Sequence, residues 1–370
     1  MTPFVIGSIN GFSPNDYIGQ RLGELGDCIS CTVSSDLTGK YELKLVYPDN
    51  GWFADQFEIG QCIVCWPSLY YVKSGGDHKT DFFVIYKITA SPGSTMTINA
   101  EHISYHLAKE IAQPYTITDI TNQTQVNTAL FSILQTLTEF KAICDLTTPG
   151  TLTIPQYTTV REVINKITET YGGYVEYRSN SLYGRVELWF RDNLAHNTFS
   201  KPWTYAYGSS IKAFKEEISD ENAYTHIFPY FKNGTTVVIS NVTNNTIATG
   251  WTRGGMLEDP CIKPVDLTNR FSSTPTQAQV TAMANKYISE NTWGPTLTMT
   301  VEPSPDLAFQ AVHLGDYVDV LVDKYGIGVQ HSNVSALEYD VINERNTKMT
   351  IGTIKTTLAK TLNGIAGGIL

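Results

Sequence analysis

The chain has 370 residues, long enough for two to four domains, and carries a net charge of −10. This acidic balance argues against a nucleic-acid-binding protein, which needs clustered cations to neutralise phosphates. No apolar run approaches membrane-spanning length and no basic segment indicates a signal peptide, so the six cysteines are expected to be reduced thiols of a protein made in a cytoplasm. Abundant Tyr and Phe, with only 17% charged residues, predict a β-rich protein.

Residues 1–109 are predicted to form a first small β-barrel domain. Apolar and polar residues alternate at period two over 27–33 and 40–47, and Ser35–Gly39 supplies the turn between these strands. Further strands are expected at 61–66, 81–88 and 94–100. Pro48–Gly51 is a strong turn.

Two CxxC pairs make the best zinc candidate of the chain: Cys28 with Cys31, and Cys62 with Cys65. Four thiolates could tie two neighbouring strands together. However, each pair lies inside an alternating strand, where positions i and i+3 point to opposite faces. The favoured interpretation is therefore that these cysteines are small apolar positions of the barrel, with no metal.

His102 and His106 form a second candidate metal site, with Glu101 and Glu110 nearby. One helical turn could present both imidazoles. The glutamate does not stand where a His-Glu-x-x-His site needs it, so a solvated helix face is the favoured interpretation.

Residues 110–200 are predicted to form an α/β domain with two helices and a hairpin. The first helix is expected over 124–144, with one apolar face formed by Val126, Leu130, Ile133, Leu137, Phe140 and Ile143. The second begins at Thr159, where Glu162 completes a capping box, and ends at Gly172-Gly173. A hairpin should follow, with strands at 174–177 and 185–190.

A second barrel is predicted to be split, with parts at 201–232 and 297–354. Between them, 233–296 is expected to form a small inserted α+β domain, with an Asn/Thr-rich hairpin over 233–251. A helix should follow, capped by Thr274 with Pro275 at its first position, and run to about 291. Residues 355–370 are expected to be a tail or linker.

The closing segment of the chain reads as strand, turn, strand, turn, strand. Val318, Val320 and Val322 alternate with polar or larger residues after the turn at Gly315-Asp316. Asp316, Asp319 and Asp323 lack the central Gly and terminal Glu of a calcium loop. No nucleophile elbow, P-loop or dinucleotide motif is present anywhere, and the acidic run Glu216–Glu221 is expected to be a solvated edge.

Four separate segments resemble the siphophage tail-associated hub proteins, the prophage tail endopeptidase family. They are the hairpin Gly39–Gly51, Ala100–Ala108, Tyr205–Tyr230 with its Pro229-Tyr230 exit, and the end region with Leu314-Gly315-Asp316 and Glu338-Tyr339-Asp340. The family has a Gly after the Pro-Tyr pair, where this chain has Phe231.

The resemblance implies a baseplate-hub-like fold of class α+β, with two small barrels, an α/β domain and an inserted domain. It further implies a ring-forming homotrimer that closes the tail tube, binds the distal tail protein, and opens for DNA ejection. Tail tube, tape measure and receptor-binding baseplate proteins are the other implied partners, and the location is the virion tail tip. The family's lytic module would follow the hub region, so no catalytic residues or cofactors are expected here.

Two alternatives remain open at this point. A tail-associated cell-wall hydrolase would place a carboxylate pair roughly 5–9 Å apart in a groove of the α/β domain or the insertion. A baseplate component of a contractile machine would share the fold and differ in its partners.

Overall fold

The computed structural model describes residues 2–8, 21–67, 81–90, 93–131, 140–148, 150–180, 185–195, 202–219, 224, 226–239, 262–271, 273–290, 296–304, 312–322 and 328–352. The chain divides into two compact units. The larger comprises Met1–Phe214 and Thr300–Leu370, and the smaller comprises Lys215–Met299.

The main sheet of the larger unit contains thirteen strands of the described residues. Its first seven strands are β1 (Phe4–Ser8), β2 (Arg21–Glu24), β3 (Ser30–Asp36), β4 (Tyr41–Pro48), β5 (Gln61–Cys65), β6 (Asp81–Ala90) and β7 (Thr95–His102). The others are β13 (Trp203–Ala206), β14 (Ile211–Ser219), β18 (Thr296–Pro303), β19 (Tyr317–Val322), β20 (Gly328–Asp340) and β21 (Arg345–Gly352). The period-two patterns predicted at β3, β4 and β7 are confirmed, because alternate side chains of these strands are buried.

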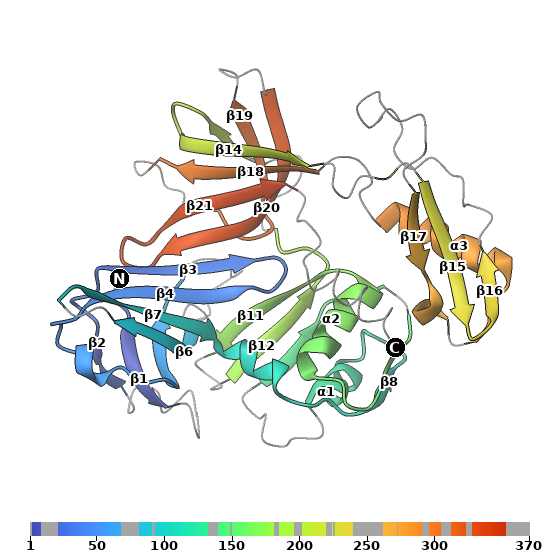
Figure 1. Cartoon of the computed structure of the whole chain (residues 1–370), viewed down its shortest axis with the longest axis horizontal. Helices are drawn as coiled ribbons and strands as arrows, with labels where there is room; N and C mark the ends of the chain where they lie inside the picture. Colours follow the sequence, from blue (N-terminus) through green and yellow to red (C-terminus); the bar gives the residue numbers. More distant parts are fainter. Residues whose placement is uncertain are drawn as a thin grey trace. The chain divides into compact units, whose positions relative to one another are not determined.

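This sheet runs without a break from the first part of the chain to the last. Its order is β14-β18-β21-β20-β3-β4-β7-β6-β5-β1-β2, and β19 joins β13 to β20. The junction is the antiparallel pairing of β20 with β3, from Ala336 opposite Asp36 to Asp340 opposite Thr32. In Figure 1 the red hairpin β20–β21 lies beside the blue strand β3.

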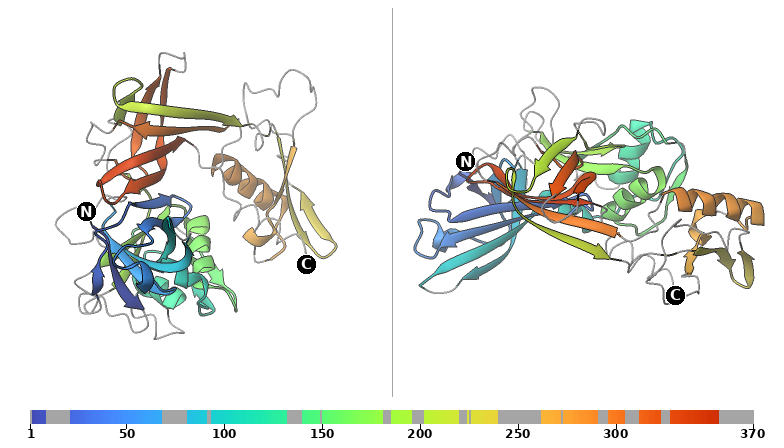
Figure 2. Two further views of the ribbon diagram at one scale, coloured as in Figure 1. Left: turned by 60° about the vertical axis from the view of Figure 1, so that its left-hand side comes forward. Right: turned by 90° about the horizontal axis from the view of Figure 1, so that it is seen from above.

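The strands of the first hundred residues curl around an apolar core, as both views of Figure 2 show. The largest fully buried side chains are mostly from this core: Tyr41, Tyr47, Phe83, Leu25, Leu43, Leu45, Ile63, Ile85 and Ile98. Short 3-10 helices η1 (Ala54–Gln56) and η2 (Ile103–Ala108) follow β4 and β7. The β-rich α+β class is thus confirmed in this coarse form, whereas the two separate barrels and the domain boundaries stay predictions.

Residues 115–191 add helices and two small sheets. The elements are β8 (Tyr115–Ile117), α1 (Gln123–Phe131), β9 (Phe140–Cys144), β10 (Leu152–Ile154), α2 (Val160–Tyr171), β11 (Tyr174–Asn180) and β12 (Arg185–Arg191). One sheet pairs β10 with β8, and the other has the order β11-β12-β9. The predicted hairpin is confirmed by β11 and β12.

The predicted long helix over 124–144 is wrong at its C-terminal end. Helix α1 is described to Phe131, and Phe140–Cys144 forms strand β9, parallel to β12. Ile133 and Leu137 lie outside the described residues. The apolar spacing of Phe140 and Ile143 fits a strand edge as well as a helix, and pairing with β12 decides between them.

The predicted start and end of α2 are confirmed. The hydroxyl of Thr159 accepts a hydrogen bond from the backbone N–H of Glu162, whose carboxylate accepts one from the N–H of Thr159. Gly172 ends the helix at φ +83°, a conformation that glycine adopts without a steric penalty.

The smaller unit has a sheet of order β16-β15-β17, with β15 at His226–Asn233, β16 at Thr236–Ile239 and β17 at Ile262–Asp266. The 3-10 helix η3 (Thr268–Arg270) and α3 (Gln277–Glu290) follow. One sheet face packs on α3 through the buried residues Ile227, Phe231, Val265, Leu267, Val280 and Ala284. The sequence analysis had grouped β15 with the second barrel; its partners are β16 and β17.

The predicted cap of α3 is displaced by one half turn. The hydroxyl of Thr276 accepts a hydrogen bond from the N–H of Gln279, and the Gln279 side chain accepts one from the N–H of Thr276. Thr276 therefore caps the helix in place of Thr274, and Pro275 precedes the cap. The predicted hairpin beyond 239 and the tail 355–370 lie outside the described residues.

Candidate functional site

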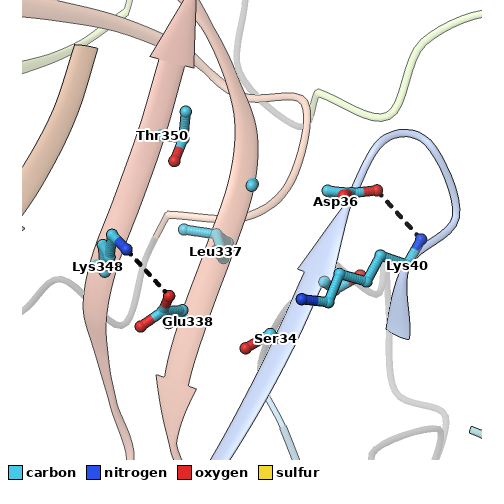
Figure 3. A pocket seen from close by; sticks show the side chains of 9 residues that line it. Ser34, Asp36, Lys40, Leu337, Glu338, Lys348 and Thr350 are labelled. Atoms are coloured by element: carbon cyan, nitrogen blue, oxygen red, sulfur yellow. Dashed lines mark hydrogen bonds and ion pairs between the residues drawn. The ribbon is translucent and has the colours of Figure 1, made fainter. Parts of the chain in front are cut away.

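The first candidate site is a shallow polar depression over the junction of β3 with β20, with a volume of about 130 Å³. Figure 3 shows the side chains that line it: Ser34, Asp36, Lys40, Leu337, Glu338, Lys348 and Thr350. Small-molecule sites usually span about 300–1,000 Å³ and are largely apolar. This depression is smaller and more polar than such a site.

Its charged groups are engaged with one another or with backbone. Asp36 Oδ1 accepts hydrogen bonds from the N–H of Thr38 at 2.8 Å and from that of Lys40 at 3.1 Å, which builds the β3–β4 turn. The Lys348 ammonium lies 3.2 Å from Glu338 Oε1 (Figure 3). The two carboxylates therefore shape the sheet junction, and nothing here matches a paired general acid and base.

A second depression, of about 150 Å³, lies beside the conserved-looking turn at Gly315 and is lined by Leu37, Tyr174, Asp192, Asn193, Gly315, Tyr317 and Asn333. Gly315 has φ +84°, and a Cβ on it would lie 2.7 Å from the Leu194 Cβ. Asp316 is fully buried, and its Oδ2 accepts a hydrogen bond from the N–H of His313 at 2.9 Å. The turn motif is thus explained by close packing.

Four buried side chains have the composition of a hydrolase triad with an added tyrosine. His102 Nδ1 lies 2.9 Å from Ser104 Oγ, and His102 Nε2 lies 3.5 Å from Asp81 Oδ1. Asp81 Oδ2 accepts a hydrogen bond of 2.5 Å from the Tyr41 hydroxyl. Ser104 and His102 have no exposed surface, however, and a nucleophile must reach its substrate. The histidine side chain instead caps η2 by accepting from the N–H of Ser104.

The favoured interpretation of His102 and His106 as a solvated helix face is wrong for His102. His102 ends strand β7, is fully buried, and stacks on Tyr41 with ring centroids 4.5 Å apart. Only His106 lies on a helix, η2, where burial lowers the pKa of its imidazole. The strand-to-helix boundary separates the two rings, so they do not form a pair of ligands.

The four cysteines of the CxxC pairs lie in the first sheet. Cys31 is on β3, Cys62 and Cys65 are on β5, and Cys28 precedes β3. Burial raises the pKa of Cys28 to about 12 and raises that of Cys62 and Cys65, the last also through the neighbouring Cys31 thiol. Protonated thiols are poor metal ligands. Among the residues that the structure describes, no group of three or more His, Cys, Asp or Glu side chains could hold a metal ion.

Sequence reasoning missed a buried charged cluster on the hairpin β11–β12. Arg178 donates to both carboxylate oxygens of Glu176, at 2.8 and 2.9 Å, and its guanidinium stacks over the Trp189 ring at 4.5 Å. Arg191 Nη1 lies 3.6 Å from Glu176 Oε2. The i, i+2 spacing of Glu176 and Arg178 on a predicted strand was the available signal, since it places both on one face. The bidentate pair leaves Glu176 committed to the arginine.

Of the predicted acidic residues near the C-terminus, Asp316 is buried in its turn and Asp319 lies on β19 against His331. Asp323 lies outside the described residues, as do Asp220 and Glu221. Among the described helices, none is long and apolar enough to cross a membrane.

Comparisons with known proteins identify the fold. No protein-family model matches the chain, and no curated protein matches it in sequence. Prophage tail protein gp18 from Listeria monocytogenes is similar in structure, with a TM-score of 0.58, 14% identity, and 99% of each chain covered. A tail protein from Neisseria meningitidis has a TM-score of 0.57 and 14% identity, over 95% of this chain and 96% of that one.

A third similar structure is the 43 kDa tail protein of prophage MuSo2 from Shewanella oneidensis. Its TM-score is 0.56 at 12% identity, and 96% of this chain and 98% of that chain are covered. The described chain therefore has the fold of phage tail proteins, and the similarity extends over nearly its whole length.

Proposed function

We propose that this chain is a structural protein of a phage or prophage tail, placed at the tail tip or baseplate as a hub. The observation that carries the proposal is the fold similarity to three prophage tail proteins, each over at least 95% of this chain. Similarity over a whole chain, and not over one module, favours a shared architectural role.

The proposed assembly is a homotrimeric ring that closes the end of the tail tube and opens for DNA ejection. A single hydrogen-bonded sheet joins residues 30–36 to residues 328–352, which supports a stiff protomer able to transmit force around a ring. The net charge of −10 suits a passage that DNA must leave without binding. The partners would be the distal tail protein, the tail tube and tape measure, and receptor-binding baseplate proteins.

We further propose that the chain itself has no enzymatic activity. The two depressions are small, their carboxylates are engaged in turns and ion pairs, and the serine beside His102 is fully buried. These observations support a hub and offer no support to the cell-wall hydrolase considered from sequence.

The mass of the purified chain in solution tests the proposal. Light scattering at several concentrations should give a species of about three times 41.1 kDa, and negative-stain images should show rings. A monomer at every concentration would remove ring closure from the proposal. Release of soluble fragments from purified cell walls would favour the hydrolase.

A further inference from the structure

The turn after β4 presents an exposed tryptophan on a fixed backbone. Trp52 has 80% of its surface exposed, yet its N–H donates to Asp27 Oδ2 at 3.1 Å and its carbonyl accepts from Gln56 Nε2 at 3.0 Å. Asp27 is held in turn by the Tyr47 hydroxyl, at 3.2 Å. A large aromatic side chain that is held rigidly and left in water is typical of the centre of a protein–protein interface.

Further apolar side chains accompany Trp52 on neighbouring segments. Ile29, two residues after Asp27, is 56% exposed, and Ile59, at the end of the same loop, is 63% exposed. We call Ile29, Trp52 and Ile59 the tryptophan knob. Phe53, next to Trp52, is buried against Gly23 of β2, so the knob stands on a packed base.

The knob is surrounded by negative charge. Asp27, Asp55 and Glu58 are exposed around it, and no Lys or Arg occurs between positions 45 and 67. An occupant of this surface must therefore offer an apolar area bordered by cations.

The smaller unit offers such a surface on the sheet face opposite α3. Strand register places Phe228, Tyr230, Val237, Ile239 and Ile262 on this face, because their strand partners alternate with the residues of the buried core. Phe228, Val237, Ile239 and Ile262 are 38–52% exposed. We call these five residues the open sheet face.

The charge of this part of the smaller unit is opposite to that of the knob. From β15 to the end of α3, the described residues include four cations and two carboxylates. They are Lys232, Lys263, Arg270 and Lys286, against Asp266 and Glu290. Lys232 is exposed beside Val237 on the open sheet face itself, and Asp266 on that face is hydrogen-bonded by Tyr230. In a chain of net charge −10, such a basic apolar surface is unusual.

We infer that the tryptophan knob of one copy of this chain docks on the open sheet face of a second copy. The occupant is the chain itself because the two surfaces are complementary in charge and both are apolar at their centres. Two different patches that meet in this way form a heterologous contact, which closes into a ring when the rotation allows. The inference thus rests on the proposed ring and names its protomer–protomer interface.

Trp52→Ala in the full chain is the first test, with Tyr157→Ala as the matched control. Tyr157 is also an exposed aromatic residue, at 85%, but lies outside both surfaces. Trp52→Ala should weaken self-association at least about 30-fold, as loss of an interface hot spot does, and leave the thermal midpoint of the monomer unchanged. Tyr157→Ala should leave self-association unchanged. Sedimentation velocity over a concentration series measures both.

A charge exchange tests the identity of the occupant. Lys232→Glu alone, and Asp55→Lys with Glu58→Lys alone, should each weaken the assembly. The chain that carries all three changes should regain it, because the signs are again opposite. A lysine-to-glutamate change at Lys286, on α3, is the control and should not be rescued by the same partners.

The outcomes separate this inference from the proposed function. A trimer that persists in Trp52→Ala and in Lys232→Glu would overturn the interface and leave the ring intact. Weakening without rescue by the charge exchange would overturn the docking of these two surfaces, and indicate that the knob binds elsewhere. A monomeric wild-type chain would overturn both the ring and the interface.

Discussion

Gly315→Ala tests the explanation given for the turn before β19. An alanine at φ +84° costs about 1 kcal/mol in backbone strain. The added Cβ would also lie 2.7 Å from the Cβ of Leu194 and 3.1 Å from the N of Ala195, and relief of such a contact in a packed region costs about 1–3 kcal/mol. The change should therefore lower the free energy of unfolding by roughly 2–4 kcal/mol.

Gly208→Ala provides the matched control, since Gly208 has φ +87° and no heavy atom within 4 Å of an added Cβ. It should cost only the strain, about 1 kcal/mol. Urea unfolding followed by tryptophan fluorescence, at one protein concentration for all variants, measures the difference. If Gly315→Ala is no more destabilising than Gly208→Ala, the close approach to Leu194 does not explain this glycine.

Three further predictions concern α2 and buried acidic protons. Thr159→Ala removes the hydroxyl that accepts from Glu162 and should cost about 1 kcal/mol, whereas Thr159→Ser should cost little; equal urea midpoints for the two would contradict the cap. Arg161→Ala removes charged hydrogen bonds of 2.8 and 2.9 Å to a hydroxyl on β11 and to a carbonyl in the β3–β4 turn, and should lower unfolding free energy by roughly 1–3 kcal/mol, with Arg161→Lys unable to restore both. Thermal stability should hold below pH 9 and fall toward pH 12, because burial raises the pKa of Cys28 from 9.0 to about 12 and that of Tyr105 from 10.0 to about 12, so the unfolded chain loses these protons first; melting curves that rise over this range would refute it.

Local signals in the sequence predicted those elements whose partners are close along the chain. The capping box of Thr159 and Glu162 is complete within one helical turn, and Gly172 ends the same helix. The hairpin of β11 and β12 needs only a short turn to bring its strands together. In these cases the residues that decide the structure lie within about twenty positions of one another.

The errors have distant partners in common. Phe140–Cys144 becomes a strand because β12 pairs with it, from Val186 opposite Phe140 onward. His102 is buried because Tyr41 and Asp81 arrive from two other strands. Neither environment is present in the residues next to the segment, so apolar spacing alone could not select strand over helix, or core over surface.

The candidate surfaces follow the same rule. Alternation along β15 indicates that Phe228 and Tyr230 share a face, but not which face α3 covers. The exposure of Trp52 could not be inferred either, because tryptophans are more often buried than not. Only the packing of Phe53 on β2 shows that the adjacent indole is turned to solvent.

The pairing of β3 with β20 also governs when this protein can finish folding during its synthesis. Thr32 pairs with Asp340, so more than three hundred residues must be translated before β3 gains its second neighbour. At roughly 5–20 residues per second, the edge of β3 stays open on the ribosome for about 15–60 s. An open edge can pair with other nascent chains, so the host's chaperones would have to protect this one strand through most of translation.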